Sequence, residues 1–332
     1  MPMSLPDEYP HPEVTIMATS ETTARTEAAA EQTIRRRGGW AGEGTLTHPA
    51  PVGLAFVTPA LILVLTFVIA PLMFALYISV TNWPLIGSYQ FVGLRNYLNI
   101  IEDAGFHRAV GYTLLYTAIV TLPILVLGYL MAVVVRANRR GSGVLRAVFF
   151  LPYVIGLSTL SFMLVLEAQP GSGAINLILK RLGLTDGNTA WLVNGPLATG
   201  LICVLVIWGV SGLTMLLLVS GMQGISRDIY ESAMLDGASW LRTERDITIP
   251  MLRQPIAMSL IISVIGSFLA FSQFFILTQG GPGSQTTPIV LYIYQRAFVQ
   301  LQVGAATAQS IVLVIVVALI TALQFRLLRE KD

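Results

Sequence analysis

Long stretches without charged residues alternate with short polar segments along this chain. Each stretch is long enough for the roughly 20 apolar residues with which a helix crosses a bilayer. Backbone groups in lipid must be hydrogen-bonded within the protein, so runs of this length favour helices. The stretches without Asp, Glu, Lys or Arg are 44–94, 109–135, 147–166, 187–226, 254–295 and 297–325. They predict six membrane-spanning helices at about 52–80, 109–135, 147–166, 197–220, 256–278 and 305–327.

Composition agrees with an all-α integral membrane protein. Hydrophobic residues make up 54% of the 332 residues and charged residues 11%, and the mean hydropathy is +0.71. A soluble domain of this composition would expose large apolar patches. The lipid bilayer is therefore an expected partner, and a net charge of +2 gives no indication of nucleic acid.

Basic residues predict the orientation. With a cytoplasmic N-terminus, fifteen of the 20 Lys and Arg residues fall in inner segments and five in outer loops, namely Arg95, Arg108, Lys180, Arg181 and Arg296. Cytoplasmic loops of membrane proteins carry such an excess. We therefore expect a multi-pass protein of the plasma membrane with both termini in the cytoplasm.

Outside the predicted spans, residues 1–48 are rich in Thr, Ala, Glu, Ser, Pro and Gly and predict a disordered cytoplasmic tail, with Met17 as an alternative start. The transmembrane domain is then 49–332. Cys203 is the single cysteine, so no intrachain disulfide is possible and we expect a buried free thiol.

A charged stretch interrupts the apolar pattern at about 221–255, which we call the polar segment. Asp228 precedes Ile229 and Glu231 follows, an order that predicts a helix capped by Asp228 with an acidic first turn. Gly237 permits a turn after this helix. In helical spacing from Ile229, small or short side chains share one face, which suits close approach by another surface.

The motif Glu-x-Ala-x-x-Asp-Gly-Ala in the polar segment, followed by an Ile and a Pro, resembles the cytoplasmic loop of permease subunits in binding-protein-dependent ABC importers. The resemblance implies two short helices joined at the glycine, which dock on a separate ATPase. The residues implied in this coupling are Glu231, Ala233, Asp236, Gly237, Ala238, Ile247 and Pro250. One position departs from the pattern: Glu244 stands where the family usually has an aromatic residue.

Two outer segments extend this resemblance to about residues 52–330. Residues 91–97 and 280–298 resemble external loops of sugar-type permeases. The resemblance implies a type I importer permease fold in a bacterial inner membrane. It also implies a second permease subunit as heterodimer partner, a cytoplasmic ATPase dimer and an extracytoplasmic solute-binding protein, for which the outer segment 167–196 is a predicted contact.

No nucleotide, metal or catalytic site is predicted in this chain. A phosphate-binding loop needs Gly-Lys followed by Ser or Thr, and the only lysines, Lys180 and Lys331, do not follow glycine. ATP and Mg²⁺ are therefore expected on the partner ATPase. The spans also contain no His-Glu-x-x-His motif.

Uncharged polar and aromatic residues in the later spans are candidates for a solute path, because hydroxyl, amide and ring groups suit a neutral polyhydroxylated solute. We expect a sugar, with glycerol phosphate as the alternative. The same residue types are common at helix packing faces. The candidates are Trp208, Thr214, Ser267, Ser272, Gln273 and Gln309.

Two other classes of membrane protein deserve comparison. Gly209-Val210-Ser211-Gly212 matches a motif of intramembrane serine proteases, but the three histidines, which would have to supply the base, lie outside the predicted spans. A proton- or sodium-driven carrier would place ionisable groups in its spans. The predicted spans lack Asp, Glu, Lys and Arg in their central parts, which argues against it.

Overall fold

A computed structural model describes residues 50–84, 86–136 and 141–328. The chain forms two compact units, 1–70 and 71–332. In the first unit the described residues are helical, with α2 (Ala50–Val64) followed by the π-helical turn η1 (Leu65–Ile69). The predicted tail at 1–48 lies outside the described residues.

The second unit consists of helices joined by short connections. Its elements are the rest of α3 (Ala70–Ser79), α4 (Arg95–Glu102), α5 (Ala104–Arg136), α6 (Ser142–Ile155), α7 (Leu157–Glu167), α8 (Ala174–Arg181), η2 (Trp191–Val193), α9 (Gly195–Gln223), α10 (Arg227–Leu235), α11 (Trp240–Thr243), η3 (Glu244–Thr248), α12 (Ile249–Met251), α13 (Arg253–Phe268), α14 (Ser272–Leu277), α15 (Ile289–Tyr294), η4 (Gln295–Val299) and α16 (Val303–Leu328).

Four described helices are long and apolar enough to cross a membrane, and up to six spans result if each of two bent pairs counts as one. The helical membrane fold is therefore confirmed. Two expected spans, however, are not single helices. Residues 147–166 are bent by 88° between α6 and α7, at Gly156, whose φ of 85° ends the helix. The stretch 256–278 is broken after α13, which ends at Phe268.

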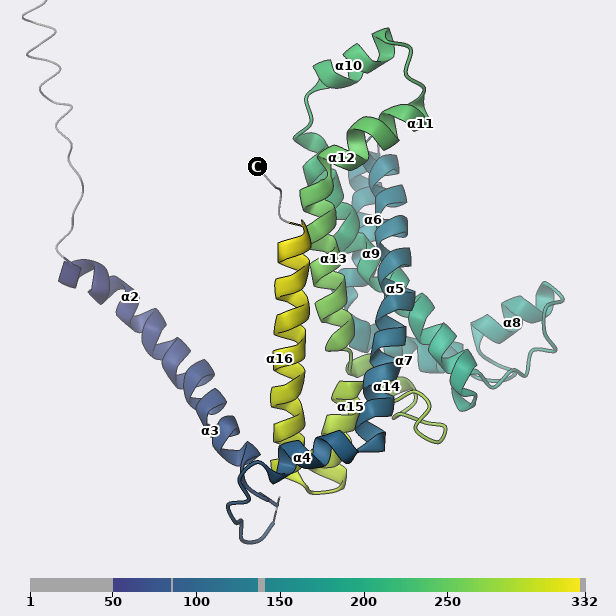
Figure 1. Ribbon diagram of the computed structural model, residues 1–332. Helices are drawn as coiled ribbons and strands as arrows, with labels where there is room; N and C mark the ends of the chain where they lie inside the picture. The colour runs from purple at the N-terminus through teal and green to yellow at the C-terminus, as the bar shows by residue number, and fades with distance from the viewer. Residues whose placement is uncertain (1–49, 85, 137–140, 329–332) are drawn as a thin grey trace, which may run out of the picture. The chain divides into compact units, whose positions relative to one another are not determined.

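Helices α5 and α9 form the centre of the second unit (Figure 1). Their close approach depends on a missing side chain, because a Cβ on Gly128 of α5 would lie 2.6 Å from Cγ2 of Thr214 on α9. On the far side of α9, Gly212 packs in the same way against the carbonyl oxygen of Phe149 in α6. Small residues at such crossings are typical of membrane helices, which associate through close packing.

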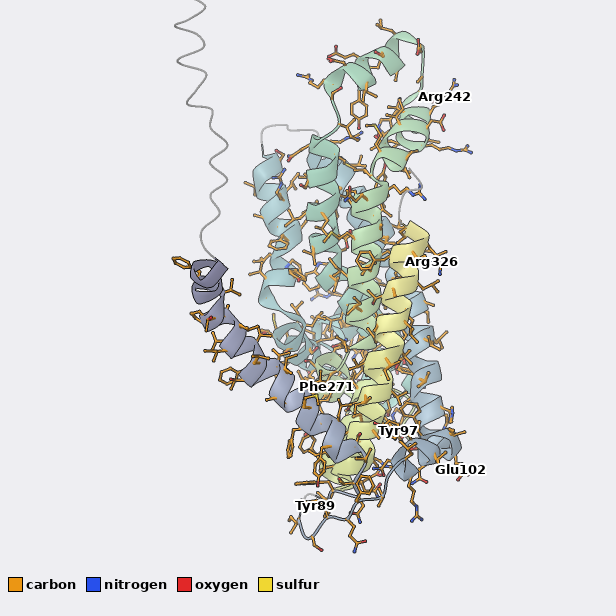
Figure 2. The ribbon with its side chains drawn as sticks, turned by 60° about the vertical axis from the view of Figure 1, so that its left-hand side comes forward. Tyr89, Tyr97, Glu102, Arg242, Phe271 and Arg326 are labelled. Carbon is orange, nitrogen blue, oxygen red and sulfur yellow. The ribbon has the colours of Figure 1, made fainter. Side chains whose placement is uncertain are left out.

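The two ends of the second unit carry different elements. Helices α10 and α11 extend beyond the long helices at one end, and α4 lies at the other (Figure 1). Figure 2 shows Arg242 and Arg326 toward the first end and Glu102 at the opposite one. The connections predicted as cytoplasmic thus share the end that carries the polar segment. The placement of that end in the cytoplasm remains a prediction.

Candidate functional site

Helix α10 ends in a turn built on Gly237. The Gly237 N–H donates to the Met234 carbonyl at 3.1 Å, and the Ala238 N–H donates to the Ala233 carbonyl at 2.9 Å. These two bonds form a Schellman motif, which needs a left-handed residue after the helix. Gly237 supplies it with φ of 73°. The expected pair of short helices joined at this glycine is confirmed, with α11 beginning three residues later.

The expected cap of this helix is wrong. Helix α10 begins at Arg227, its N-cap is Ser226, and no side chain caps it. Asp228 therefore lies inside the first turn, where its charge still complements the helix dipole. The Glu231 and Asp236 side chains are exposed and form no ion pair among the described residues. Their carboxylates are thus accessible at the surface of the chain.

Large apolar side chains surround the Gly237 turn, a feature that sequence analysis did not identify. Leu235 is 90% exposed and Leu241 is 71% exposed. Met234 and Trp240 are likewise exposed. Helices α10 and α11, on either side of this turn, extend beyond the long helices (Figure 1). Exposed apolar groups gathered in this way are typical of surfaces that contact another protein or a membrane. The sequence signal was present, since all four flank the Asp236-Gly237 pair.

A cleft of about 470 Å³ lies between α10 and the α11–η3 segment. It brings together four of the seven predicted coupling residues, whereas Glu231, Gly237 and Pro250 do not line it. One wall carries the exposed ion pair between Arg242 Nε and Asp246 Oδ2, at 3.6 Å. The predicted residues that line the cleft are Ala233, Asp236, Ala238 and Ile247.

Glu244, the position that departs from the family pattern, is buried and ion-paired. Its carboxylate accepts from both terminal nitrogens of Arg136, the last residue of α5, and from Tyr129 Oη at 2.5 Å. The Arg136 guanidinium also lies over the Tyr230 ring, 5.5 Å from its centroid, and Tyr230 Oη lies 3.3 Å from Thr248 Oγ1. We call these five residues the Arg136 cluster.

The Arg136 cluster joins three elements, because it takes residues from α5, α10 and η3. Polar groups replace the aromatic packing expected at position 244. Arg136 therefore holds the polar segment against a long helix. No local pattern could show this, because the two charged partners are 108 residues apart.

A second polar cluster lies at the opposite end. The Asp103 carboxylate accepts from the Gly105 and Phe106 N–H groups at 3.0 and 3.1 Å, so it caps α5. It also accepts from Arg296 at 3.0 Å and from Tyr292 at 2.8 Å. Burial raises the pKa of this carboxyl, but the hydrogen bonds and the Arg296 charge outweigh burial and hold the pKa below its usual value.

The six solute-path candidates are spread over the second unit. Four are buried in packing: Thr214 against Gly128, Ser267 donating to the Ser263 carbonyl, Gln273 donating to Tyr116 Oη at 3.4 Å, and Gln309 donating to Asp103 Oδ2 at 3.2 Å. Ser272 is partly exposed at the start of α14, and Trp208 is 47% exposed on α9. Contact between the four buried residues and a solute would therefore need a rearrangement of the chain.

Partly buried aromatic rings lie beside Ser272. The Phe271 and Phe275 rings stack with centroids 5.2 Å apart, and Tyr294 contacts both at 5.2 and 5.4 Å. Figure 2 shows Phe271 in the half of the second unit that contains Glu102. The group includes Phe271, the residue directly before Ser272.

Ser211, the serine of the protease-like motif, has the contacts of a packing residue. Its Oγ donates to the Trp208 carbonyl at 3.2 Å and lies 3.8 Å from the Met131 sulfur. The one described histidine, His107, is at the opposite end beside Asp103, where its Nδ1 lies 2.8 Å from the Asp103 carbonyl oxygen. Among the described residues, Ser211 thus has no general base.

The comparison with known families agrees with this architecture. Residues 124–331 match the family described as binding-protein-dependent transport system inner membrane component. These residues include the polar segment, the α9 core helix and the groups of aromatic rings. The chain belongs to this family, and is therefore a permease component of an ABC transport system in the inner membrane.

Individual relatives cover nearly the same length. The chain is 32% identical over 283 residues to the multiple sugar-binding transport system permease protein MsmF of Streptococcus mutans, covering 84% of this chain and 96% of the relative. It is 29% identical to the sn-glycerol-3-phosphate transport system permease protein UgpA of Agrobacterium fabrum, covering 83% and 94%.

A solved structure has the same fold. It is the crystal structure of a bacterial alginate ABC transporter in complex with an alginate pentasaccharide-bound periplasmic protein. One of its chains superposes with a TM-score of 0.75 at 21% identity, covering 84% of this chain and 94% of that one. The expected type I permease fold is thereby confirmed.

Proposed function

We propose that this chain is one of two permease subunits of an importer that carries a neutral sugar, delivered by an extracytoplasmic binding protein and driven by a separate cytoplasmic ATPase dimer. The relative MsmF supports a sugar through its name, and the uncharged lining candidates support a neutral one. The relative UgpA keeps glycerol phosphate as the alternative. Against it, the solute-path candidates include no basic residue to pair with a phosphate.

The observation that carries the proposal is the exposed apolar patch at the Gly237 turn. A side chain such as Leu235, 90% exposed on a segment that extends beyond the long helices, is stabilised by contact with another protein. The exposed carboxylates of Glu231, in the middle of α10, and of Asp236, at its C-terminal end, are available for hydrogen bonds from that partner. We infer that the ATPase docks on this patch and that the seven coupling residues shape it.

Force applied at the patch is transmitted to the spans through the Arg136 cluster. The Arg136 cluster connects η3 and α10 to the end of α5, and α5 packs along α9. A buried, hydrogen-bonded charge pair resists separation more than exposed contacts do. Movement of the docked segment is therefore expected to move α5 together with it. This role also requires the polar segment to be cytoplasmic.

The solute is expected to pass near the aromatic rings of α14 and α15 and near Trp208. An apolar ring face suits stacking on a pyranose, while Ser272 and, after a rearrangement, Gln273 offer hydrogen bonds. On the outer side, helix α8 and its flanking loops are the proposed contact for the binding protein. Its exposed residues Leu177 and Ile178 would form part of that contact.

Docking on the patch is tested by co-purification. The double variant Leu235→Ser and Leu241→Ser removes two apolar side chains that are 90% and 71% exposed. The matched control is Ile86→Ser, 83% exposed at the opposite end. We expect the tagged control to retain the ATPase and the double variant to lose most of it at equal membrane levels. Equal recovery from both would refute docking at this patch.

A further inference from the structure

A groove of about 990 Å³ lies between α13 and α16, outside every site described above. The first residue of α13 and the last turn of α16 form its mouth, because the two helices run in opposite directions. Figure 2 shows Arg326 in this position, toward the end that carries the polar segment.

Helical geometry explains the shape of the groove. On α13, Arg253, Ala257 and Ile261 follow one another at intervals of four residues, so they lie on one face. On α16, Ala322 and Arg326 share the same relation. The short side chains of the two alanines do not fill the space between the helices. The resulting groove has a basic mouth and an apolar floor.

Among the residues that the structure describes, none neutralises the charges at the mouth. Arg253 and Arg326 are exposed and form no ion pair with any residue that the structure describes. The described residues that line the groove include no Asp or Glu. By contrast, Arg136 and Arg296 each have a carboxylate partner. The N-terminal end of α13, which carries a partial positive charge, lies at the same mouth and adds to the attraction for an anion.

The length of the groove matches one leaflet of a bilayer. From Arg253 to Ile261 a helix rises about 12 Å, at about 1.5 Å per residue. Half of the roughly 30 Å hydrocarbon core is about 15 Å. A phosphate held at the mouth would therefore leave an acyl chain running along Ala257 and Ile261 toward the middle of the membrane.

We propose that this groove binds an anionic phospholipid of the cytoplasmic leaflet, with Arg253 and Arg326 on the phosphate and one acyl chain in the apolar part. The leaflet follows from the orientation proposed above. An apolar helix of another subunit would fill the floor but leave two guanidiniums without counter-charge at the membrane surface. A phospholipid satisfies both parts, as in other basic pockets between membrane helices.

The test uses the full chain, purified in detergent with its partner subunits and mixed with phosphatidylglycerol. Bound lipid is counted by native mass spectrometry, and phosphatidylcholine and inorganic phosphate serve as comparison ligands. We expect retention of phosphatidylglycerol alone. The double variant Arg253→Gln and Arg326→Gln is expected to bind it roughly 30-fold more weakly, since each arginine near an anionic headgroup contributes about fivefold.

Two further variants make the outcome decisive. Lys180→Gln with Arg181→Gln removes the same net charge at the other end and should bind phosphatidylglycerol as the wild type does. Arg253→Lys with Arg326→Lys keeps the charge and should retain most of the binding, which excludes misfolding as the cause of the loss. Unchanged phosphatidylglycerol binding in the glutamine variant would overturn the proposal. If the glutamine variant lost the second permease subunit during purification but still bound phosphatidylglycerol, the groove would instead be a subunit interface.

Discussion

Arg136 at the end of α5 and Glu244 in η3 form a buried ion pair in which both terminal guanidinium nitrogens contact the carboxylate. The Glu244 side chain is 6% exposed and the Arg136 side chain 25% exposed. Water can therefore hydrate Arg136 when Glu244 is removed, but it reaches Glu244 poorly when Arg136 is removed. This difference makes the pair testable by single and double substitution.

Removal of Arg136 is expected to cost more than removal of Glu244. In Arg136→Met the Glu244 carboxylate stays buried without its counter-charge, and we expect a loss of about 2 to 3 kcal/mol. In Glu244→Phe the partly exposed Arg136 can reach water, so the loss should be about 1 kcal/mol. The double variant restores the aromatic residue typical of the family and should recover most of the stability. Thermal unfolding of the purified complex measures all three.

The exposed pair of Arg242 and Asp246 is the matched control for this cycle. Both side chains are more than half exposed, and such pairs contribute less than about 1 kcal/mol. Arg242→Met should therefore leave the melting temperature nearly unchanged. If Arg136→Met behaved in the same way, the Arg136 cluster would not hold the polar segment.

Gly237→Val is expected to abolish uptake and the stimulation of ATPase activity by loaded binding protein. A Cβ at this position meets nothing within 4 Å in the chain itself, so the damage comes from a φ of 73° and from bulk facing the partner. The strain of a β-branched residue in this region costs about 1 to 3 kcal/mol. Gly237→Asn, which tolerates this conformation, should keep most of the stimulation. The assay is the ATPase rate in liposomes, and normal stimulation in the valine variant would contradict the prediction.

The orientation can be measured with single cysteines at two exposed serines. Ser226 precedes α10 and Ser284 lies in the connection at the opposite end. In a Cys203→Ser background, a membrane-impermeant maleimide applied to intact cells should label position 284 only. Permeabilised cells, in which both positions should react, are the control. Labelling at 226 in intact cells would reverse the proposed orientation.

Asp103 should stabilise the outer end in a pH-dependent way. Its pKa is lowered in the folded chain, so its contribution is complete above its ordinary pKa of about 4 and disappears as the pH falls through the folded-state value. Asp103→Asn keeps an oxygen that can cap α5 and removes the charge. We expect a loss of about 1 to 2 kcal/mol at pH 7, which shrinks below about pH 4. A difference in unfolding temperature that does not change with pH would argue against the ion pair with Arg296.

Local features of this protein followed from sequence because their causes are local. Charge-free runs predict membrane helices because backbone N–H and C=O groups in lipid must form hydrogen bonds within the protein. A single glycine after an amphipathic stretch predicted the turn at Gly237, which depends on one backbone angle. The motif around Glu231 and Asp236 located the polar segment. The arginine asymmetry predicted which connections share one end of the second unit.

Tertiary structure alone decided how distant positions meet. The partner of Glu244 lies 108 residues away, and helical periodicity carries no information over that distance. Packing also decided that Thr214 fills the space left by Gly128 and that Gln309 binds Asp103, so neither faces open space in this chain. The groove between α13 and α16 has its room where the small residues Ala257 and Ala322, distant in sequence, both line it. Hydropathy specifies which residues leave water, whereas the crossing of helices determines which of them touch.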